Sequence, residues 1–271
     1  MTFDNYQFHY SLSGSADKPV ILFLHGFMGD CNEFNQVISF LSDQFCCLTV
    51  DLPGHGQTKV IGGDEWYKMA NTARALLNLL EQLSIKKCFL VGYSMGGRLA
   101  LYLTLHFPER FPKVVLESAS PGLKTEGERW KRLQRDLELS QELVTTNFST
   151  FLTNWYNQPL FVSLKKHPKF EQMIESRLQN NPFELAKSIR NLSTGCQPSL
   201  WEALKQNQNP MLLLVGEYDE KFKIINSEMA RLCGAAKVNQ ISNCGHNIHM
   251  ENPRAFFDKV RQFLAKPVAI Y

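Results

Sequence analysis

The stretch CFLVGYSMGGRLALYL, residues 88–103, decides the fold of this chain. A G-x-S-x-G pattern between an apolar strand and an apolar helix forms a sharp strand-to-helix turn, the nucleophile elbow. Gly92 and Gly96 let backbones approach where a β-carbon would not fit, so the Ser94 hydroxyl projects clear of the sheet. It also lies at a helix N-terminus, where free N–H groups favour negative charge. We interpret Ser94 as a reactive hydroxyl rather than a simple helix cap.

Five other apolar runs have the length of a strand. They are VILFLHG (20–26), CCLTVDLPG (46–54), KVVLESA (113–119), MLLLVGEYD (211–219) and KVNQIS (237–242). Near-continuous apolar runs are typical of strands buried on both faces of a parallel sheet. The stretch YQFHYSLSG alternates apolar and polar residues, which favours an antiparallel edge strand.

Helical patterns lie between these runs. Asp64 is positioned to cap a helix whose apolar stripe ends near Leu83. The segment after Ser94 continues as a helix until Pro108 stops it, and a last helix follows Pro253. The alternation of strands and helices predicts an α/β fold with a doubly wound, mostly parallel sheet flanked by helices.

One region interrupts this alternation. Residues 121–205 contain no convincing strand, are rich in polar residues with isolated aromatic ones, and are too long for a loop. We interpret them as a helical lid insertion that sits on the sheet. The α/β core is then formed by residues 1–120 and 206–271.

Composition excludes some classes of function and location. The net charge is only +3 and no long Lys/Arg block occurs, so we expect no nucleic-acid partner. No apolar run approaches the roughly 20 residues that span a bilayer, and the N-terminus lacks the layout of a signal peptide. Three of the seven cysteines, Cys46, Cys47 and Cys88, lie in apolar runs, and no C-x-x-C pair occurs. We expect reduced thiols and a cytoplasmic protein without stable membrane insertion.

A reactive serine needs a histidine to take its proton and a carboxylate to orient that histidine. In the elbow fold the chain order is serine, acid, histidine. Asp219 ends the run 211–219, and His246 follows the run 237–242, so both have the expected order. Glu217 is the rival acid and His249 the rival histidine. We prefer His246 because it comes first after the strand and follows a glycine.

A developing oxyanion requires two backbone N–H donors. One is expected from Met95, the residue after the serine. The other is expected from Phe27, in a loop whose HGF sequence resembles the oxyanion loop of α/β-hydrolases. His25 before it is expected to buttress the loop. In the turn DLPGHG (51–56), Asp51 is expected to cap the turn and His55 to be structural.

The sequence contains no pattern for a cofactor. No H-E-x-x-H motif, C-x-x-C pair or carboxylate cluster indicates a metal. The glycines of GYSMGG match neither a dinucleotide fingerprint nor a P-loop. We therefore expect no metal and no other cofactor. We also expect the protein to work as a monomer.

Two sets of motifs resemble known families. The first set, which matches the α/β-hydrolase superfamily along nearly the whole chain, is HGFMGD, DLPGHG, GYSMGGR, GEYD and GHNIHMENP. The second set is SPGLKTEGERWKR, NWYNQPLF, SRLQNNP, CQPSLW and VGEYDEKF. It resembles 2-succinyl-6-hydroxy-2,4-cyclohexadiene-1-carboxylate (SHCHC) synthases of menaquinone and phylloquinone biosynthesis.

This resemblance implies a lyase rather than a hydrolase. The family's substrate is a cyclohexene that bears a ring carboxylate, a succinyl chain and an enolpyruvyl ether. The enzyme removes a ring proton and expels pyruvate to leave a conjugated diene. In this scheme Ser94 is the base, activated by His246 and Asp219. The Phe27 and Met95 amides hold the enolate oxygen that develops on the succinyl carbonyl.

A small tricarboxylate substrate calls for cationic partners, and arginine grips a carboxylate with two donors. Arg98 follows the serine by one helical turn. The matching motifs imply that Arg132, in GERWKR, and Arg177, in SRLQNNP, bind the other two carboxylates. Arg129 and Arg135 are rivals to Arg132 at helical spacing, and only the motif match separates the three.

The resemblance also implies that Tyr93 and Trp155 line the substrate pocket. Met28 departs from the small polar residue that is common in the family's oxyanion loop, and Met95 replaces a common leucine. Two alternatives stay open. One is a serine esterase or carbon–carbon bond hydrolase that acts on a small carboxylated substrate, and the other is a binding module that lost catalysis.

Overall fold

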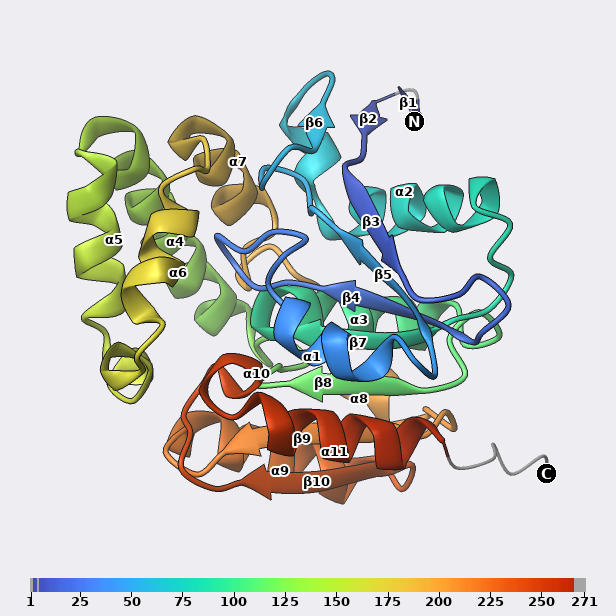
Figure 1. Ribbon diagram of the computed structural model, residues 1–271. Coiled ribbons are helices and arrows are strands. Elements are labelled where there is room, and N and C mark those ends of the chain that lie inside the picture. The colour runs from blue at the N-terminus through green and yellow to red at the C-terminus, as the bar shows by residue number, and fades with distance from the viewer. Residues whose placement is uncertain (1, 4, 266–271) are drawn as a thin grey trace.

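A seven-stranded sheet forms the centre of the computed structural model, which describes residues 2–3 and 5–265 (Figure 1). Its strand order is β10-β9-β8-β7-β4-β5-β3, and every neighbouring pair is parallel except β3 and β5. The strands are β3 (Tyr10–Ser13), β4 (Val20–Leu24), β5 (Cys46–Val50), β7 (Phe89–Tyr93), β8 (Val114–Glu117), β9 (Met211–Gly216) and β10 (Ala236–Ile241). A small antiparallel sheet joins β1 (Thr2–Phe3), β2 (Tyr6–Gln7) and β6 (Lys59–Val60).

The apolar runs form the strands because both faces of the sheet are covered. Every residue of β5 and of β9 is buried. In the register of the sheet, Leu22 of β4 pairs with Leu48 of β5 and with Leu90 of β7. This register aligns apolar side chains across the strands. The predicted α/β fold and its antiparallel edge strand are confirmed.

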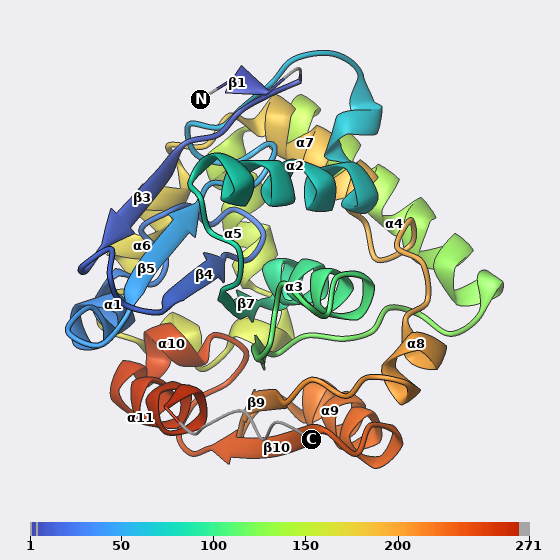
Figure 2. The same ribbon diagram turned by 90° about the vertical axis from the view of Figure 1, so that its right-hand side faces the viewer.

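Helices cover the two faces of this sheet. One hydrophobic cluster packs α2 (Met69–Gln82), α3 (Ser94–His106) and α9 (Glu220–Leu232) on one face. A second cluster packs α1 (Asn35–Leu41), α10 (Ile248–Glu251) and α11 (Pro253–Leu264) on the opposite face, and Figure 2 shows the two layers. The loops that follow the parallel strands leave the sheet at the edge where the carboxyl ends of these strands meet.

The helix expected after Asp64 begins later than predicted. Asp64 starts the short 3-10 helix η1 (Asp64–Tyr67), whereas α2 has Lys68 as its N-cap residue. The extended backbone of Lys68 separates the two helices. The Asp64 carboxylate forms an ion pair with Arg190 instead of capping α2.

Residues 121–205, hereafter the helical segment, lie between β8 and β9. All of these residues are described, and none forms a strand. The segment contains α4 (Glu126–Thr145), α5 (Phe148–Tyr156), η2 (Pro159–Phe161), η3 (Leu164–Lys166), α6 (Phe170–Arg177), α7 (Pro182–Asn191) and α8 (Trp201–Lys205). Helices α4–α7 lie at the left of Figure 1, beyond the carboxyl ends of the strands. These helices pack around a third hydrophobic cluster, which includes Phe151 and Leu185. Met28, from the loop after β4, also belongs to this cluster.

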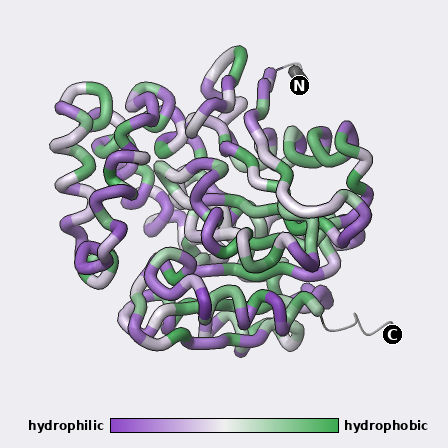
Figure 3. Tube along the Cα trace, in the orientation of Figure 1, coloured by the Kyte–Doolittle hydropathy of each residue, from purple (hydrophilic) through white to green (hydrophobic). Residues whose placement is uncertain are grey.

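The distribution of hydrophobic residues follows this architecture. Figure 3 shows hydrophobic residues along the central strands, whereas α4–α6 alternate between hydrophobic and hydrophilic positions. All seven cysteines carry free thiols, and only Cys196 is exposed. Within residues 2–3 and 5–265, no helix is both long and apolar enough to cross a bilayer.

Candidate active site

The turn between β7 and α3 carries Ser94 in a strained conformation. Its φ angle is 49°, in the left-handed region that non-glycine residues rarely adopt. A β-carbon on Gly96 would lie 2.1 Å from the Leu24 carbonyl oxygen, and one on Gly92 would lie 2.6 Å from the Gly96 oxygen. Only glycine at both positions lets the elbow pack against the end of β4. This packing fixes the position of the serine hydroxyl.

The structure brings Ser94, His246 and Asp219 together. His246 Nε2 lies 3.0 Å from Ser94 Oγ, and His246 Nδ1 lies 2.7 Å from Asp219 Oδ2. His246 and Asp219 are both buried. Asp219 follows β9 and is the N-cap of α9, where its other oxygen accepts the Phe222 N–H at 3.3 Å. The helix terminus thus holds the carboxylate while its second oxygen faces the imidazole.

The rival acid and the rival histidine have other partners. Glu217 accepts a hydrogen bond from the Asn243 N–H at 2.8 Å. His249 is buried between two carboxylates, with Nδ1 2.7 Å from Glu117 and Nε2 3.2 Å from Glu33. Neither Glu217 nor His249 forms a hydrogen bond with the Ser94–His246 pair among the residues described.

The loop that carries Phe27 is held from behind. His25 Nε2 accepts the Leu52 N–H at 2.9 Å, which confirms that His25 buttresses the loop. Asp51 caps its turn as predicted, because it accepts the Gln57 N–H at 2.8 Å. Phe27 and Met95 line the same cavity as Ser94. Met95 is the second residue of α3, where backbone N–H groups have no partner within the helix.

A cavity of about 400 Å³ opens beside the serine. It lies between the elbow, the loop after β8, α9 and the helical segment. Its lining includes Ser94, His246, Arg98, Arg132 and Trp155. A volume of this size is within the range of small-molecule sites.

Two of the three predicted arginines line this cavity. Arg98 donates to Gln197 Oε1 at 2.8 Å and to the Leu192 carbonyl at 2.9 Å, and it forms no ion pair with any described carboxylate. Burial lowers the pKa of Arg98 to about 10, and the nearby Arg132 charge adds to this effect. Arg132 pairs with buried Asp136, with Nε 2.9 Å from each carboxylate oxygen. The Asp136 carboxylate thus compensates the Arg132 charge, whereas Arg98 has only neutral hydrogen-bond partners among the described residues.

The rivals of Arg132 do not line the cavity. Arg135 is exposed and pairs with Glu138 at 3.0 Å, and Arg129 reaches the Leu123 carbonyl at 3.4 Å. Only Arg132 of these three side chains faces the site. The tertiary structure therefore separates residues that spacing alone left equivalent.

Arg177 has a different environment. It is buried, with Nη2 2.6 Å and 2.8 Å from the two Glu33 oxygens and Nε 3.4 Å from the Tyr156 hydroxyl. It lines a separate hollow of about 30 Å³ together with Ser94, Tyr93 and Trp155. The three arginines thus flank Ser94 from two sides, and Arg177 already has an acidic partner.

Sequence reasoning missed the charged residues that surround these arginines. Lys221 lines the large cavity two residues after Asp219, and Asp136 neutralises Arg132. Glu33 pairs with Arg177, and His249 contacts the same Glu33 carboxylate. The motif VGEYDEKF contained Lys221, but no local pattern indicated which of its side chains faces a cavity.

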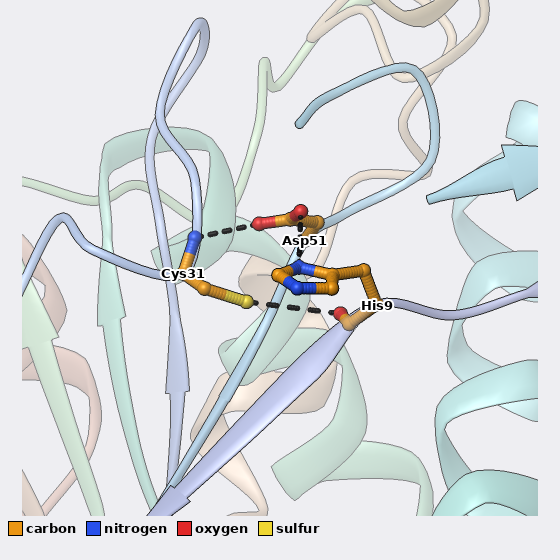
Figure 4. A group of neighbouring side chains, drawn as sticks. All are labelled: His9, Cys31 and Asp51. Carbon is orange, nitrogen blue, oxygen red and sulfur yellow. Dashed lines mark hydrogen bonds and ion pairs between the residues drawn. The ribbon is translucent and has the colours of Figure 1, made fainter. Parts of the chain in front are cut away.

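One His/Cys/Asp group in the described chain has donor atoms close enough for a metal. In Figure 4, His9, Cys31 and Asp51 face one another, with donor atoms within 4.8 Å. Asp51 is already fully engaged, because it accepts the Cys31 N–H at 2.6 Å, the Gln57 N–H at 2.8 Å and a bond with His9 at 2.8 Å. Burial, with the Asp51 charge, raises the pKa of the Cys31 thiol. These contacts describe a capped turn, and the donor set does not fit a metal.

Comparisons with known proteins agree with this geometry. The alpha/beta hydrolase fold family matches residues 19–253. A 2-succinyl-6-hydroxy-2,4-cyclohexadiene-1-carboxylate synthase of Citrobacter koseri is 36% identical over 251 residues, which cover 93% of this chain and 96% of that one. The chloroplastic protein PHYLLO of Arabidopsis thaliana is 35% identical over 95% of this chain, which spans 16% of PHYLLO. The structure of MenH from S. aureus has a TM-score of 0.88 and 34% identity, covering 97% of this chain and 98% of that one.

Proposed function

The chain belongs to the 2-succinyl-6-hydroxy-2,4-cyclohexadiene-1-carboxylate synthase family of the alpha/beta hydrolase fold, and from this premise we propose the reaction that it catalyses. It is a carbon–oxygen lyase that converts 2-succinyl-5-enolpyruvyl-6-hydroxy-3-cyclohexene-1-carboxylate into SHCHC and pyruvate. This step belongs to menaquinone or phylloquinone biosynthesis. A proton leaves ring carbon 2, the ring double bond shifts, and the carbon–oxygen bond at carbon 5 breaks. The departing enolpyruvate takes up a proton and becomes pyruvate.

Ser94 is the base for this proton in our proposal. Its hydroxyl lies 3.0 Å from His246 Nε2, so the imidazole can accept the serine proton as the oxygen takes the ring proton. Asp219 fixes the imidazole tautomer and stabilises its charged form. The carbanion is conjugated with the succinyl carbonyl, and in this proposal the Phe27 and Met95 amides stabilise the resulting enolate oxygen.

The observation that carries this proposal is Arg98, which lines the cavity with the serine and forms no ion pair with a described carboxylate. A simple ester hydrolase needs no cation there, and charges removed from water are usually paired with an opposite charge. Arg98 has only neutral hydrogen-bond partners among the described residues. A substrate carboxylate would complete its coordination, with Arg132 and Arg177 as further carboxylate-binding residues. Tyr93 and Trp155 provide the apolar walls.

The helical segment is the lid in this proposal. Trp155 of α5 lies 5.2 Å from Phe27, measured between ring centroids, so the segment roofs the oxyanion loop. The protein is a monomer in this proposal. We propose that this monomer acts in the cytoplasm.

The test is a comparison of pyruvate release with hydrolysis of a neutral aryl ester. A charge-assisted hydrogen bond contributes about 1.5–3 kcal/mol, so Arg98→Ala should lower kcat/KM for the tricarboxylate by roughly ten- to a hundredfold. Arg98→Lys should keep only part of the wild-type kcat/KM, because lysine lacks the planar guanidinium that donates two parallel hydrogen bonds. The exposed Arg135→Ala is the matched control and should change neither activity.

The esterase alternative predicts the opposite result. A wild-type enzyme that prefers the neutral ester, with Arg98→Ala and Arg132→Ala variants that keep both activities, would replace the lyase by a general esterase. The ester assay also separates loss of binding from loss of fold, since a folded Arg98→Ala variant retains its triad.

A further inference from the structure

We propose that Lys221 is an additional carboxylate-binding residue of this site. The proposal rests on the function proposed above and names a cation that neither the motifs nor the relatives' names assign. It extends the arginine set with a residue that stands directly beside the triad. Its support is the position of the side chain, its lack of an acidic partner and the charges that face it.

The first step is position. Lys221 is in the first turn of α9, two residues after Asp219, and it lines the large cavity together with Ser94 and His246. The N-cap role of Asp219 fixes the start of this helix, which sets the direction of the lysine side chain. The residue that orients the catalytic histidine therefore also places an ammonium group at the cavity wall.

The second step is the pairing of the cavity's charges. Lys124 pairs with Glu228 at 2.7 Å, and Arg132 pairs with Asp136. Lys221 has no ion pair with any carboxylate that the structure describes, and its Nζ lies 5.5 Å from the centre of the Phe222 ring. Lys221 is exposed by surface area, but it lines the same cavity as Arg98, which likewise forms no ion pair with a described carboxylate.

The third step is electrostatic. Burial lowers the pKa of Lys221, and the Arg132 charge lowers it further, whereas Asp219 opposes the shift. Arg132 has the same effect on Arg98. Glu128, Asp136 and Glu228 also line the cavity and offset part of this positive charge, and a bound anion would compensate what remains at Arg98 and Lys221. A substrate with three carboxylates supplies more negative charge than Arg98 and Arg132 alone can balance.

Arg177 does not remove the need for this lysine. It lines the small hollow, which shares Ser94, Phe27 and Trp155 with the large cavity, and Glu33 contacts it at 2.6 Å. Among the cations that line the large cavity, Lys124 pairs with Glu228 and Arg132 with Asp136, so Arg98 and Lys221 are the two without an ion pair to a described carboxylate. A point charge such as ammonium suits a carboxylate that approaches from several directions.

The experiment compares Lys221→Met and Lys221→Arg with Lys223→Met. Lys223 is the matched control, because it lies on the same helical turn but donates to Glu220 and to the Glu217 carbonyl and does not line the cavity. We expect Lys221→Met to raise KM for the tricarboxylate roughly tenfold with kcat within about threefold. Lys221→Arg should have a KM close to that of the wild type, and Lys223→Met should have wild-type KM and kcat.

Calorimetric titration keeps this proposal separate from the proposed reaction. Succinate serves as a dicarboxylate probe and requires no turnover. Weaker succinate binding in Lys221→Met than in Lys223→Met supports the lysine site, even if the wild type releases no pyruvate. Equal succinate binding and equal KM in the two methionine variants would overturn it and leave Lys221 as a solvated side chain.

Discussion

Glu217 and Asp219 lie two residues apart at the end of β9, yet only the second carboxylate reaches His246. The difference is the helix that begins after Asp219, because its N-terminus binds one carboxylate oxygen and aims the other at the imidazole. Glu217 instead accepts a hydrogen bond from the Asn243 N–H, in the loop after β10. At the scale of single residues, backbone direction decides which acid serves the histidine.

Substitutions at Ser94, Asp219 and Glu217 test the assignment of the triad. Ser94→Ala should lower kcat by roughly a hundred- to ten-thousandfold, because general base catalysis is lost. Asp219→Asn should also impair turnover strongly, since the imidazole loses its tautomer and its charge partner. Glu217→Gln is the control and should leave pyruvate release nearly intact. If Glu217→Gln were the more damaging change, the acid would be wrongly assigned.

A second residue-scale feature is the buried row of charges Glu117, His249, Glu33 and Arg177. Their signs alternate, and each neighbour lies within 3.2 Å of the next. Burial alone would lower the pKa of His249, but the two carboxylates outweigh it and raise this pKa to about 9. Burial would likewise raise the pKa of Glu33, yet Arg177 and His249 lower it. Each charge is stabilised by its neighbours.

This row predicts a loss of stability at alkaline pH. Because the pKa of His249 is raised on folding, its contribution is complete below about pH 6.5 and is lost as the pH rises through about 9. The free energy of unfolding, measured by urea denaturation, should fall by on the order of 2 kcal/mol between pH 7 and 10. His249→Gln should be less stable at pH 7 and should lack this decline. An identical pH dependence in both proteins would exclude His249 as its source.

At the scale of elements, one amide joins the helical segment to the core. Asn180 follows α6 and is buried; its Nδ2 donates to the Met28 carbonyl at 2.9 Å, and its Oδ1 accepts the Gly56 N–H at 3.0 Å. The two partners belong to the loop of Phe27 and to the DLPGHG turn. The motif SRLQNNP therefore holds the loop that is proposed to supply an oxyanion donor.

Asn180→Ala should weaken both stability and catalysis. It leaves a carbonyl and an N–H without partners, which costs about 1–3 kcal/mol of unfolding free energy. The Phe27 loop should then be less well fixed, so we expect kcat to fall more than KM rises. Thermal unfolding and initial rates measure the two effects. Gln179→Ala, at the exposed neighbouring position, is the control. A stable Asn180→Ala enzyme with normal kcat would show that the loop holds itself.

At the scale of the whole molecule, the proposed chemistry uses the protein's own groups. The candidate metal group found among the described residues, His9, Cys31 and Asp51, belongs to the turn behind the oxyanion loop and does not line the cavity (Figure 4). Dialysis against a strong chelator should leave the rate of pyruvate release unchanged. A lost rate that zinc or magnesium restored would contradict the proposed triad mechanism. Cys31→Ser, with the same measurement, would show whether this group held the metal.

The sequence by itself determined the elements and the order of the reactive residues. The elbow, the apolar runs and the helix boundaries are local patterns, because burial on a sheet imposes them over a few residues. Asp64 shows the limit: its spacing suited a cap, but the extended Lys68 makes the helix begin later, and the Asp64 carboxylate pairs with Arg190, far along the chain. Local signals do not report partners far along the chain.

Only the tertiary structure decided which charges share the site. Spacing left Arg129, Arg132 and Arg135 equivalent, and packing of α4 turned one of them to the cavity. Arg177 meets Glu33, which lies 144 residues earlier, and Lys221 reaches the cavity because Asp219 caps α9. The pKa of a charged group and the energy of its ion pairs depend on burial and on neighbours from other elements. These are properties of the assembled fold, and no stretch of sequence specifies them alone.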